Sequence, residues 1–267
     1  MPRKSPPPHT NAQISSAEDG ATGRITESVL TWLRATYHFH TFCYRDPRSA
    51  FSSALGIPVI SPTAIVLGIA STLFGFGEAD LAREFMKQAH LCGVAVDPPE
   101  GAIFFRAFHQ LRRYVSTINK GKKESKKIHR AGFTDINQGT KEYALFDGPI
   151  TLFVGVPTRF VEPVKLALLN RDHIGAHDSM CALIGNVEEC QEPKHVLYLP
   201  PETWQTQLPR ETSVTILTLA RFAKPLTAPT VGHHWWMAGG EDTELVAYMI
   251  KGKFVGTTHG RIYLKES

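Results

Sequence analysis

The chain has 267 residues, a net charge of +4, 42% hydrophobic residues and 20% charged residues. A chain of this length and composition can bury a sizeable core, which excludes collagen-like, coiled-coil, mucin-like and largely disordered proteins. The four cysteines show no C-x-x-C spacing. They favour a reducing compartment over a disulfide framework.

The first 26 residues are rich in proline and small polar residues. They contain no apolar run of the length that a signal peptide requires. We therefore expect residues 1–26 to form a disordered tail.

The segment from residue 27 to residue 90 predicts one strand followed by two helices. Glu27–Tyr44 is dense in β-branched and aromatic residues and is expected to be a long strand. Ser61 is a suitable N-cap before Pro62, and apolar residues follow at spacings of four, so a helix is expected over Pro62–Phe74. A second helix is expected over Glu78–His90.

No charged residue occurs between Arg48 and Glu78, which raises the alternative of a membrane span. Two prolines and repeated Ser, Thr and Gly interrupt this stretch. A buried core helix explains it better than a transmembrane helix does.

The middle of the chain predicts an α+β fold. Ala102–Phe108 and Lys141–Val156 are expected to be partner strands, with helices at Glu162–Leu169 and Asp178–Ile184. The resulting order of strands and helices predicts a split β-α-β, ferredoxin-like layer over residues 27–190.

The last part of the chain, residues 191–267, contains several prolines and short β-rich runs such as Val214–Leu219 and Arg261–Leu264. We expect a smaller, mostly β region there. Trp235 and Trp236 are expected to pack in its core rather than to contact a partner.

Residues 112–130 carry the net positive charge of the protein. This segment contains eight basic residues and one acidic residue, so the remainder of the chain is net negative. Neutralising the phosphates of a polyanion is the usual use of such a segment, and a solvated loop is the alternative. The basic residues are Arg112, Arg113, Lys120, Lys122, Lys123, Lys126, Lys127 and Arg130.

Motifs for metal, cofactor or nucleophilic chemistry are not found. His38 and His40 alternate on a strand, but no further ligands follow at a recognisable spacing. The sequence has no G-x-S-x-G elbow and no Walker A motif, so we expect no cofactor. The remaining enzymatic hypothesis is metal-independent RNA cleavage by His129, Lys127 and Tyr44.

Two segments carry a resemblance to a known family. Tyr44-Arg45-Asp46-Pro47-Arg48-Ser49-Ala50-Phe51 precedes Ile60-Ser61-Pro62-Thr63-Ala64-Ile65-Val66-Leu67-Gly68, and together they resemble the helix entry of the CRISPR-associated Cas-five family of the RAMP superfamily. His177-Asp178-Ser179-Met180, after Gly175, resembles a small-polar turn of that family that leads into a short helix. The resemblance covers roughly residues 28–190.

The resemblance implies an RNA-recognition-like ferredoxin fold with a projecting thumb hairpin, here the insertion at about 112–139, and a smaller β-rich C-terminal part. It also implies a cytoplasmic, prokaryotic type I Cascade complex in which this subunit caps the 5′ handle of CRISPR RNA. The implied partners are Cas-seven backbone subunits, a large subunit and, through the complex, target DNA, with no membrane.

The same family contains one subtype that cuts precursor RNA with Tyr, Lys and His. Here Lys127-Ile128-His129 lacks an adjacent Lys-His pair. We therefore expect binding without catalysis, and endoribonuclease activity is the alternative.

Binding of single-stranded RNA requires cations for its phosphates and planar groups for its bases. Arg45 and Arg48 precede the helix entry, and the start of the Pro62 helix offers free N–H groups beside the hydroxyls of Ser61 and Thr63. Ser61 as a plain N-cap is the competing interpretation. The predicted RNA-binding residues are Arg45, Arg48, Ser61, Thr63, Arg112, Arg113, Lys120, Lys122, Lys123, Lys126, Lys127, His129 and Arg130.

Overall fold

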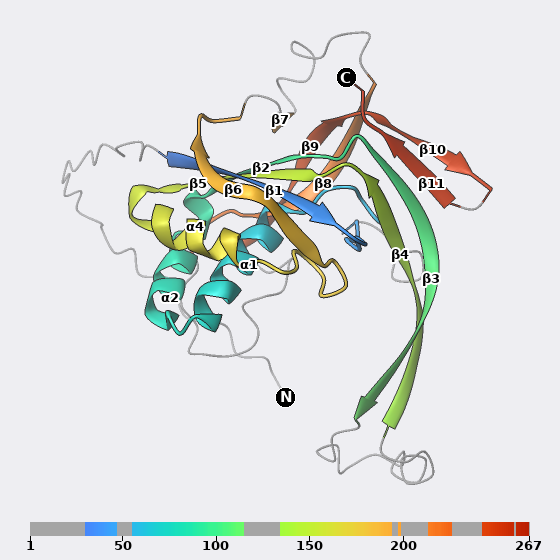
Figure 1. Ribbon diagram of the computed structural model, residues 1–267, viewed down its shortest axis with the longest axis horizontal. Coiled ribbons are helices and arrows are strands. Elements are labelled where there is room, and N and C mark those ends of the chain that lie inside the picture. The colour runs from blue at the N-terminus through green and yellow to red at the C-terminus, as the bar shows by residue number, and fades with distance from the viewer. Residues whose placement is uncertain are drawn as a thin grey trace, which may run out of the picture.

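The computed structural model describes residues 30–46, 55–108, 140–193, 213–225, 242–258 and 260–266, and the backbone alone of 109–114, 134–139 and 197–198. Three mostly antiparallel sheets and a small group of helices make up this part of the chain (Figure 1). The expected α+β class is confirmed. The predicted tail at 1–26, Trp235 and Trp236 lie outside the described residues.

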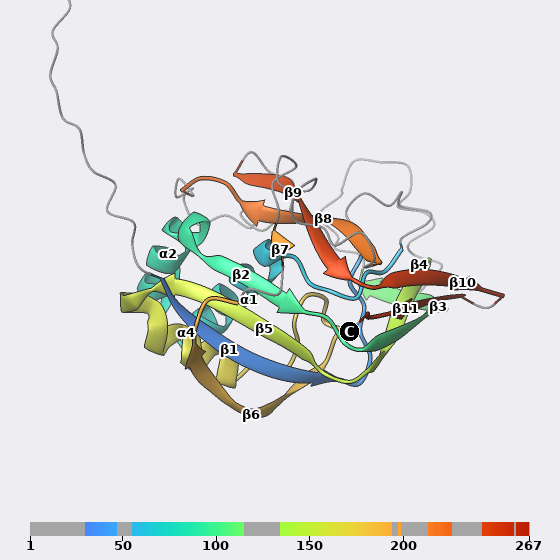
Figure 2. The same ribbon diagram turned by 90° about the horizontal axis from the view of Figure 1, so that it is seen from above.

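The first sheet has four strands in the order β2-β5-β1-β6, and every neighbouring pair is antiparallel. Its helices lie together on one face, as Figures 1 and 2 show from two directions. The strands are β1 (Leu30–Phe39), β2 (Gly93–Asp97), β5 (Ile150–Pro157) and β6 (Cys181–Cys190). The helices are α1 (Pro62–Gly75), α2 (Ala79–Lys87) and α4 (Val161–Leu169), with short 3₁₀ turns at Ala89–Leu91 and Thr158–Phe160.

Strand β1 shows why the helices cover only one face. Leu33, Ala35, Tyr37 and Phe39 alternate along the strand and are buried. Alternate residues point to the same face of a sheet, so these four residues form one apolar surface. The Tyr37 hydroxyl donates to the carbonyl of Leu168 at 2.6 Å, which joins β1 to the end of α4.

The predicted first strand is longer than the observed one. After Phe39 the chain bends, and Phe42 forms an isolated bridge with Ala144 of another sheet. Pairing with a second sheet therefore ends β1 before Tyr44.

Helix α1 confirms the predicted core helix. Its N-cap is Ser61, Pro62 is its first residue, and Ile65, Ile69 and Leu73 are buried. No helix in the described residues has the length and apolar character that a membrane span requires.

A long hairpin forms the centre of the second sheet, whose order is β10-β11-β3-β4. Strands β3 (Gly101–Tyr114) and β4 (Thr134–Asp147) are paired from Gly101 with Asp147 to Tyr114 with Thr134. The hairpin projects away from the body of the molecule (Figure 1). Its position agrees with the predicted insertion at 112–139, of which residues 115–133 lie outside the described part.

Two predicted elements around this hairpin were wrong. The expected strand Lys141–Val156 is divided into β4 and β5 by a turn at Gly148, where φ is +91°, and the two strands belong to different sheets. A positive φ is tolerated by glycine, and Pro149 follows it, so the chain turns sharply here.

The predicted helix Asp178–Ile184 is also wrong, because Cys181–Cys190 is strand β6, paired with β1. The edge of β1 supplies hydrogen-bond partners that a local propensity does not reveal. Strand β2 was not predicted, since five residues before Pro98 give too short a pattern.

The chain after residue 190 contributes to two sheets. Strands β7 (Leu197–Tyr198), β8 (Val214–Phe222) and β9 (Thr243–Lys251) form one sheet, whereas β10 (Lys253–Thr257) and β11 (Gly260–Leu264) extend the hairpin sheet through pairing of β11 with β3. The predicted β character of this region is confirmed. Leu217 of β8 and Tyr263 of β11 belong to the same hydrophobic cluster as Leu33 of β1, and the predicted domain boundary at residue 190 stays a prediction.

A buried ion pair connects three segments that lie far apart in the sequence. Glu142 of β4 has a side chain only 4% exposed and accepts from Arg261 of β11 at 2.5 Å and from the amide of Gly56 at 2.5 Å. Arg261 also donates to the Gly56 carbonyl at 2.8 Å. Its guanidinium carbon lies 5.1 Å from the ring centre of Phe104 and 5.0 Å from that of Phe254.

Replacing Glu142 with alanine should destabilise the protein strongly. It leaves Arg261 and the Gly56 amide without their shared acceptor, and losing one partner of a buried pair costs about 3 kcal/mol. Glu188→Ala is the control, because its pair with Arg34 is more than half exposed on both sides and should cost less than about 1 kcal/mol. Urea unfolding of both variants measures the difference, and equal losses would contradict the assigned role of Glu142.

Candidate nucleic-acid interface

The structure describes a minority of the predicted RNA-binding residues. Arg45, Ser61 and Thr63 are described with their side chains, and Arg112 and Arg113 are described as backbone near the end of β3. The others lie outside the described residues: Arg48, Lys120, Lys122, Lys123, Lys126, Lys127, His129 and Arg130.

A cavity of about 480 Å³ opens between the start of α1 and the loop that follows α4. Five of its lining residues carry hydroxyl groups, and three more bear ionisable side chains. The hydroxyl residues are Tyr44, Ser61, Thr63, Ser71 and Thr72, and the ionisable ones are Arg171, Asp172 and His173.

Ser61 has two hydrogen bonds at the rim of this cavity. Its hydroxyl accepts from the amide of Ala64 at 3.2 Å and lies 2.5 Å from the hydroxyl of Tyr44. Ser61 therefore caps α1, as the N-cap interpretation predicts. It also links the helix to Tyr44 in the segment that follows β1. A role of Ser61 in RNA binding stays a prediction.

Tyr44 is held in this position by the same bond. Burial raises the pKa of its phenol above the ordinary value, and the Ser61 hydrogen bond lowers it only in part. The phenol is protonated at neutral pH, so it is available as a hydrogen-bond donor and is poorly suited to accept a proton from a ribose hydroxyl.

Thr63 lies in the first turn of α1 and is only 1% exposed. Its Oγ1 has no hydrogen-bond partner among the described residues. A buried hydroxyl without a partner is uncommon in folded proteins, because leaving it unpaired costs free energy. Its backbone N–H also has no acceptor within the helix, as is general for the first turn.

Arg171 supplies the cation of the cavity. Its Nε and Nη2 donate to the carbonyl of His173 at 3.1 and 2.8 Å, and its Nη1 donates to Thr72 Oγ1 at 3.2 Å. A Cβ atom at Gly68 would lie 2.4 Å from both terminal nitrogens. The glycine therefore allows the guanidinium to lie directly on α1. Burial lowers the pKa of Arg171, but a guanidinium remains charged at neutral pH.

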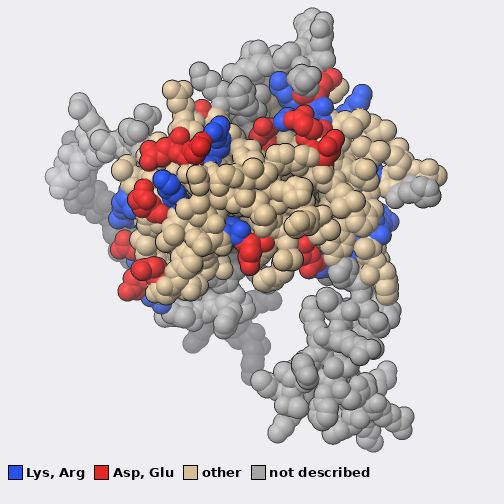
Figure 3. All heavy atoms as spheres, in the orientation of Figure 1, with Lys and Arg blue, Asp and Glu red and all other residues tan. Residues whose placement is uncertain are grey.

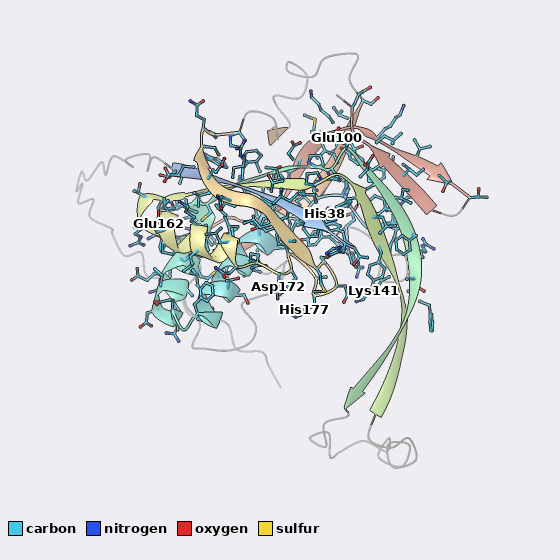
Figure 4. All side chains as sticks on the ribbon, viewed as in Figure 1. His38, Glu100, Lys141, Glu162, Asp172 and His177 are labelled. Atoms are coloured by element: carbon cyan, nitrogen blue, oxygen red, sulfur yellow. The ribbon has the colours of Figure 1, made fainter. Side chains whose placement is uncertain are left out.

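Asp172 and two histidines lie beside this cation. Asp172 Oδ1 is 2.6 Å from His173 Nδ1, and this bond lowers the pKa of the Asp172 carboxyl. The rings of His173 and His177 are 4.7 Å apart and tilted by 30°. Figure 4 shows Asp172, His177 and Lys141 along the edge of the body beside the hairpin.

The loop that bears Arg171 is bonded to the base of the hairpin through Asp178. Its Oδ2 accepts from Lys141 Nζ at 2.6 Å and from the Tyr143 hydroxyl at 2.9 Å. Ser179, which is fully buried, donates to the carbonyl of Cys43 at 3.1 Å and accepts from its amide at 3.0 Å. Hydrogen bonds and one ion pair thus connect the base of the hairpin, the segment that follows β1, and the loop beside the cavity.

Sequence reasoning did not identify Arg171, Asp178 or Lys141 as site residues. Asp178 was noted as part of a small-polar turn, and the turn is confirmed, although a strand follows it instead of a helix. Arg171 gave no signal of its own, because Gly68 and Thr72 of α1 become its neighbours only in the folded protein.

His38, on β1, and His40, which follows the end of that strand, contact each other. Their rings meet edge to face with their centres 5.5 Å apart. The described part of the chain contains no group of three or more His, Cys, Asp and Glu residues placed to hold a metal ion.

Comparison with known proteins identifies one curated relative and one similar solved structure. No family model matches it. A curated protein of Archaeoglobus fulgidus, named CRISPR-associated protein Cas5, is 25% identical over 166 residues, which cover 61% of this chain and 67% of the relative. The chain is therefore similar in sequence to a Cas5 protein. The resemblance to the Cas-five family is therefore confirmed.

A solved structure of a CRISPR protein from Archaeoglobus fulgidus is similar to this protein over 89% of this chain and 92% of its own. The sequence identity is 14% and the TM-score is 0.38. That score is too low for individual elements to be matched.

One face of the described residues is mixed in charge. Figure 3 shows acidic and basic side chains interspersed over it. The concentration of positive charge belongs to the segment at 112–130 between the hairpin strands. That segment, together with the cavity beside the hairpin base, is the candidate nucleic-acid interface.

The bond between Ser61 and Tyr44 can be tested by a double-mutant cycle. Ser61→Ala should cost about 2 kcal/mol, because it removes both the helix cap and the bond to the phenol. Tyr44→Phe should cost about 1 kcal/mol, and the double variant should be no less stable than Ser61→Ala. Thermal or urea unfolding measures the cycle, and additive losses would show that the two hydroxyls are not coupled.

Proposed function

We propose that this Cas5 homologue is a non-catalytic RNA-binding subunit of a type I Cascade complex in the prokaryotic cytoplasm. It caps the 5′ handle of CRISPR RNA and contacts the Cas-seven backbone subunits and the large subunit. The complex then targets DNA by RNA guidance. The proposal is carried by the sequence similarity to Cas5 together with a basic segment that joins, in the sequence, the two strands of a projecting hairpin.

The strand order supports a ferredoxin-like first layer. Strands β1, β2, β5 and β6 alternate with helices in a β-α-β-β-α-β sequence, and they lie in the order β2-β5-β1-β6. The hairpin β3–β4 is inserted between the second and third of these strands. This arrangement agrees with the RNA-recognition-like layer that the family resemblance implies.

RNA binding by this protein follows from charge and shape. Single-stranded RNA is held by cations at its phosphates and by planar groups against its bases. The segment at 112–130 supplies eight cations against Glu124. The segment joins two hairpin strands whose described part projects away from the body (Figure 1), which supports an extended surface for RNA.

Replacing Lys122, Lys123, Lys126 and Lys127 with glutamate should weaken binding of handle RNA on the order of a hundredfold at moderate salt. It should also reduce the magnitude of the log-log salt slope by about 3, since each neutralised phosphate contributes about 0.7. Fluorescence anisotropy with labelled handle RNA over a range of salt concentrations measures both quantities.

The matched control reverses four exposed lysines outside the basic segment: Lys87, Lys224, Lys251 and Lys253. It changes the net charge of the protein by the same amount. Affinity close to that of the unmodified protein is expected for this control. Equal loss in both variants, or no loss in the first, would refute handle binding by the basic segment.

The absence of catalysis is part of the proposal and has its own test. Tyr44 is bonded to Ser61 and its phenol has a raised pKa, which supports a positioning role over proton abstraction. Precursor repeat RNA incubated with excess protein in EDTA should remain intact on a denaturing gel. A single discrete cut that disappears in His129→Ala and in Tyr44→Phe would instead make this protein the processing endoribonuclease.

A further inference from the structure

We propose that Phe108 of β3 stacks on a base of the single-stranded handle RNA and that Arg106 binds an adjacent phosphate. This inference rests on the proposed RNA-binding function and assigns two contacts at the root of the hairpin, outside the basic segment. An exposed aromatic ring and an exposed cation occupy successive positions on one face of β3, where the hairpin leaves the body.

Phe108 is the most exposed large hydrophobic side chain in the described part of the chain, at 67%. A ring left in water gains little hydrophobic stabilisation on folding, so packing within the described protein does not explain it. Single exposed apolar residues are ordinary at protein surfaces. The neighbours of Phe108 therefore decide what its ring can bind.

Phe108 continues a row of side chains that faces the core closer to the body. Alternate residues of a strand point to the same face, so Phe104, Arg106 and Phe108 form one row. Phe104 is 1% exposed, and its ring centre lies 5.1 Å from the guanidinium carbon of Arg261 and 5.7 Å from the ring centre of Phe254. Further along the strand the body no longer covers the row, and both Arg106 and Phe108 are exposed. Figure 1 shows β3 and β4 leaving the body together.

Arg106 is a cation that no described carboxylate neutralises. Its side chain forms no ion pair and no hydrogen bond with another described residue, although Glu142 lies opposite it on β4. The Glu142 carboxylate accepts from Arg261 at 2.5 Å and from the amide of Gly56 at 2.5 Å, so Arg261 already balances its charge. Arg106 therefore keeps its positive charge and its N–H donors for a phosphate.

An aromatic ring beside a guanidinium suits single-stranded nucleic acid. Bases stack on aromatic planes, and phosphates accept from guanidinium groups. Successive residues on one face of a strand are about 7 Å apart, so one nucleotide can reach both side chains. Strand β3 then leads into the basic segment at 112–130, so the two contacts lie on the same hairpin as the cations proposed to hold RNA.

The surroundings of Phe108 favour a base over an apolar protein surface. Its described neighbours on this face are Arg106 and, opposite on β4, Thr140, and both are exposed and polar. An apolar docking patch requires several adjacent hydrophobic side chains. A single ring among polar groups can instead stack on the face of one base.

Three substitutions of Phe108 separate stacking from a general apolar contact. Phe108→Ala should weaken binding of handle RNA about tenfold, as expected for the loss of one stacked base. Phe108→Tyr keeps a planar ring and should retain the affinity, whereas Phe108→Leu keeps only apolar volume and should not. Because Phe108 is mostly exposed, all three variants should unfold at nearly the same urea concentration as the unmodified protein.

The salt dependence distinguishes the two contacts in fluorescence anisotropy with labelled handle RNA. Phe108→Ala should leave the log-log salt slope unchanged, because stacking neutralises no phosphate. Arg106→Gln should reduce the magnitude of the slope by about 0.7. Phe76→Ala is the matched control, since Phe76 is also an exposed aromatic residue but lies at the end of α1, and it should bind as the unmodified protein does.

Photocrosslinking tests the contact directly. Handle RNA with 5-iodouridine at one position at a time is irradiated in complex with the full chain, and the crosslinked peptide is identified by mass spectrometry. One position should crosslink to the peptide that contains Phe108, and the crosslink should disappear in Phe108→Ala.

Several outcomes would overturn the inference. Unchanged affinity in Phe108→Ala, with reversal of the four lysines still weakening binding, would remove the stacking contact and leave the proposed function intact. Full affinity in Phe108→Leu would replace stacking by an apolar contact, and unchanged RNA affinity with lost binding of a Cas-seven subunit would assign the ring to a protein partner. No binding of handle RNA to the unmodified protein would refute the proposed function instead.

Discussion

The ion pair of Glu142 and Arg261 is the interaction on which the arrangement of the molecule depends. It joins strand β4, strand β11 and the segment at Gly56, which comes just before α1. A carboxylate that is almost fully buried requires such partners, because an unpaired charge in a low-dielectric interior is very unfavourable. The pair therefore helps to fix how the hairpin, the C-terminal strands and the start of α1 are placed relative to one another.

Gly56 connects the buried ion pair to the segment that contributes Tyr44 and Arg45 to the candidate interface. It forms a backbone bridge with Arg45, and Ile57 donates to the carbonyl of Tyr44 at 2.9 Å. A Cβ at Gly56 would lie 3.0 Å from the Phe104 ring, so the close approach of this segment to β3 depends on glycine. The buried pair thus positions the segment that bears Tyr44 and Arg45.

Asp178 provides a second connection between hairpin and body. Its bonds to Lys141 and Tyr143 join the loop beside Arg171 to β4. With both ends of this region tied to the hairpin, the cavity and the base of the hairpin keep a defined relation.

Local patterns in the sequence predicted α1, α4 and the first strand. The signals were a cap residue followed by proline, apolar spacing along a helix, and a run of β-branched and aromatic residues, all of which act over a few neighbouring positions. The same reasoning failed at β6, where pairing with the edge of β1 overrode the expected helix at 178–184. It also predicted one strand where β4 and β5 lie, although the turn at Gly148 separates them into strands of different sheets.

The amino-acid sequence alone predicts the α+β class, the position of the buried helix, the inserted basic segment and the resemblance to the Cas-five family. These features depend on composition, on short motifs or on charge counted along the chain. The contacts of Arg171 with Gly68, of Asp178 with the hairpin and of Glu142 with Arg261 follow from the folded structure and not from local sequence. Such contacts join residues tens or hundreds of positions apart, and their partners become neighbours only when the sheets and helices pack.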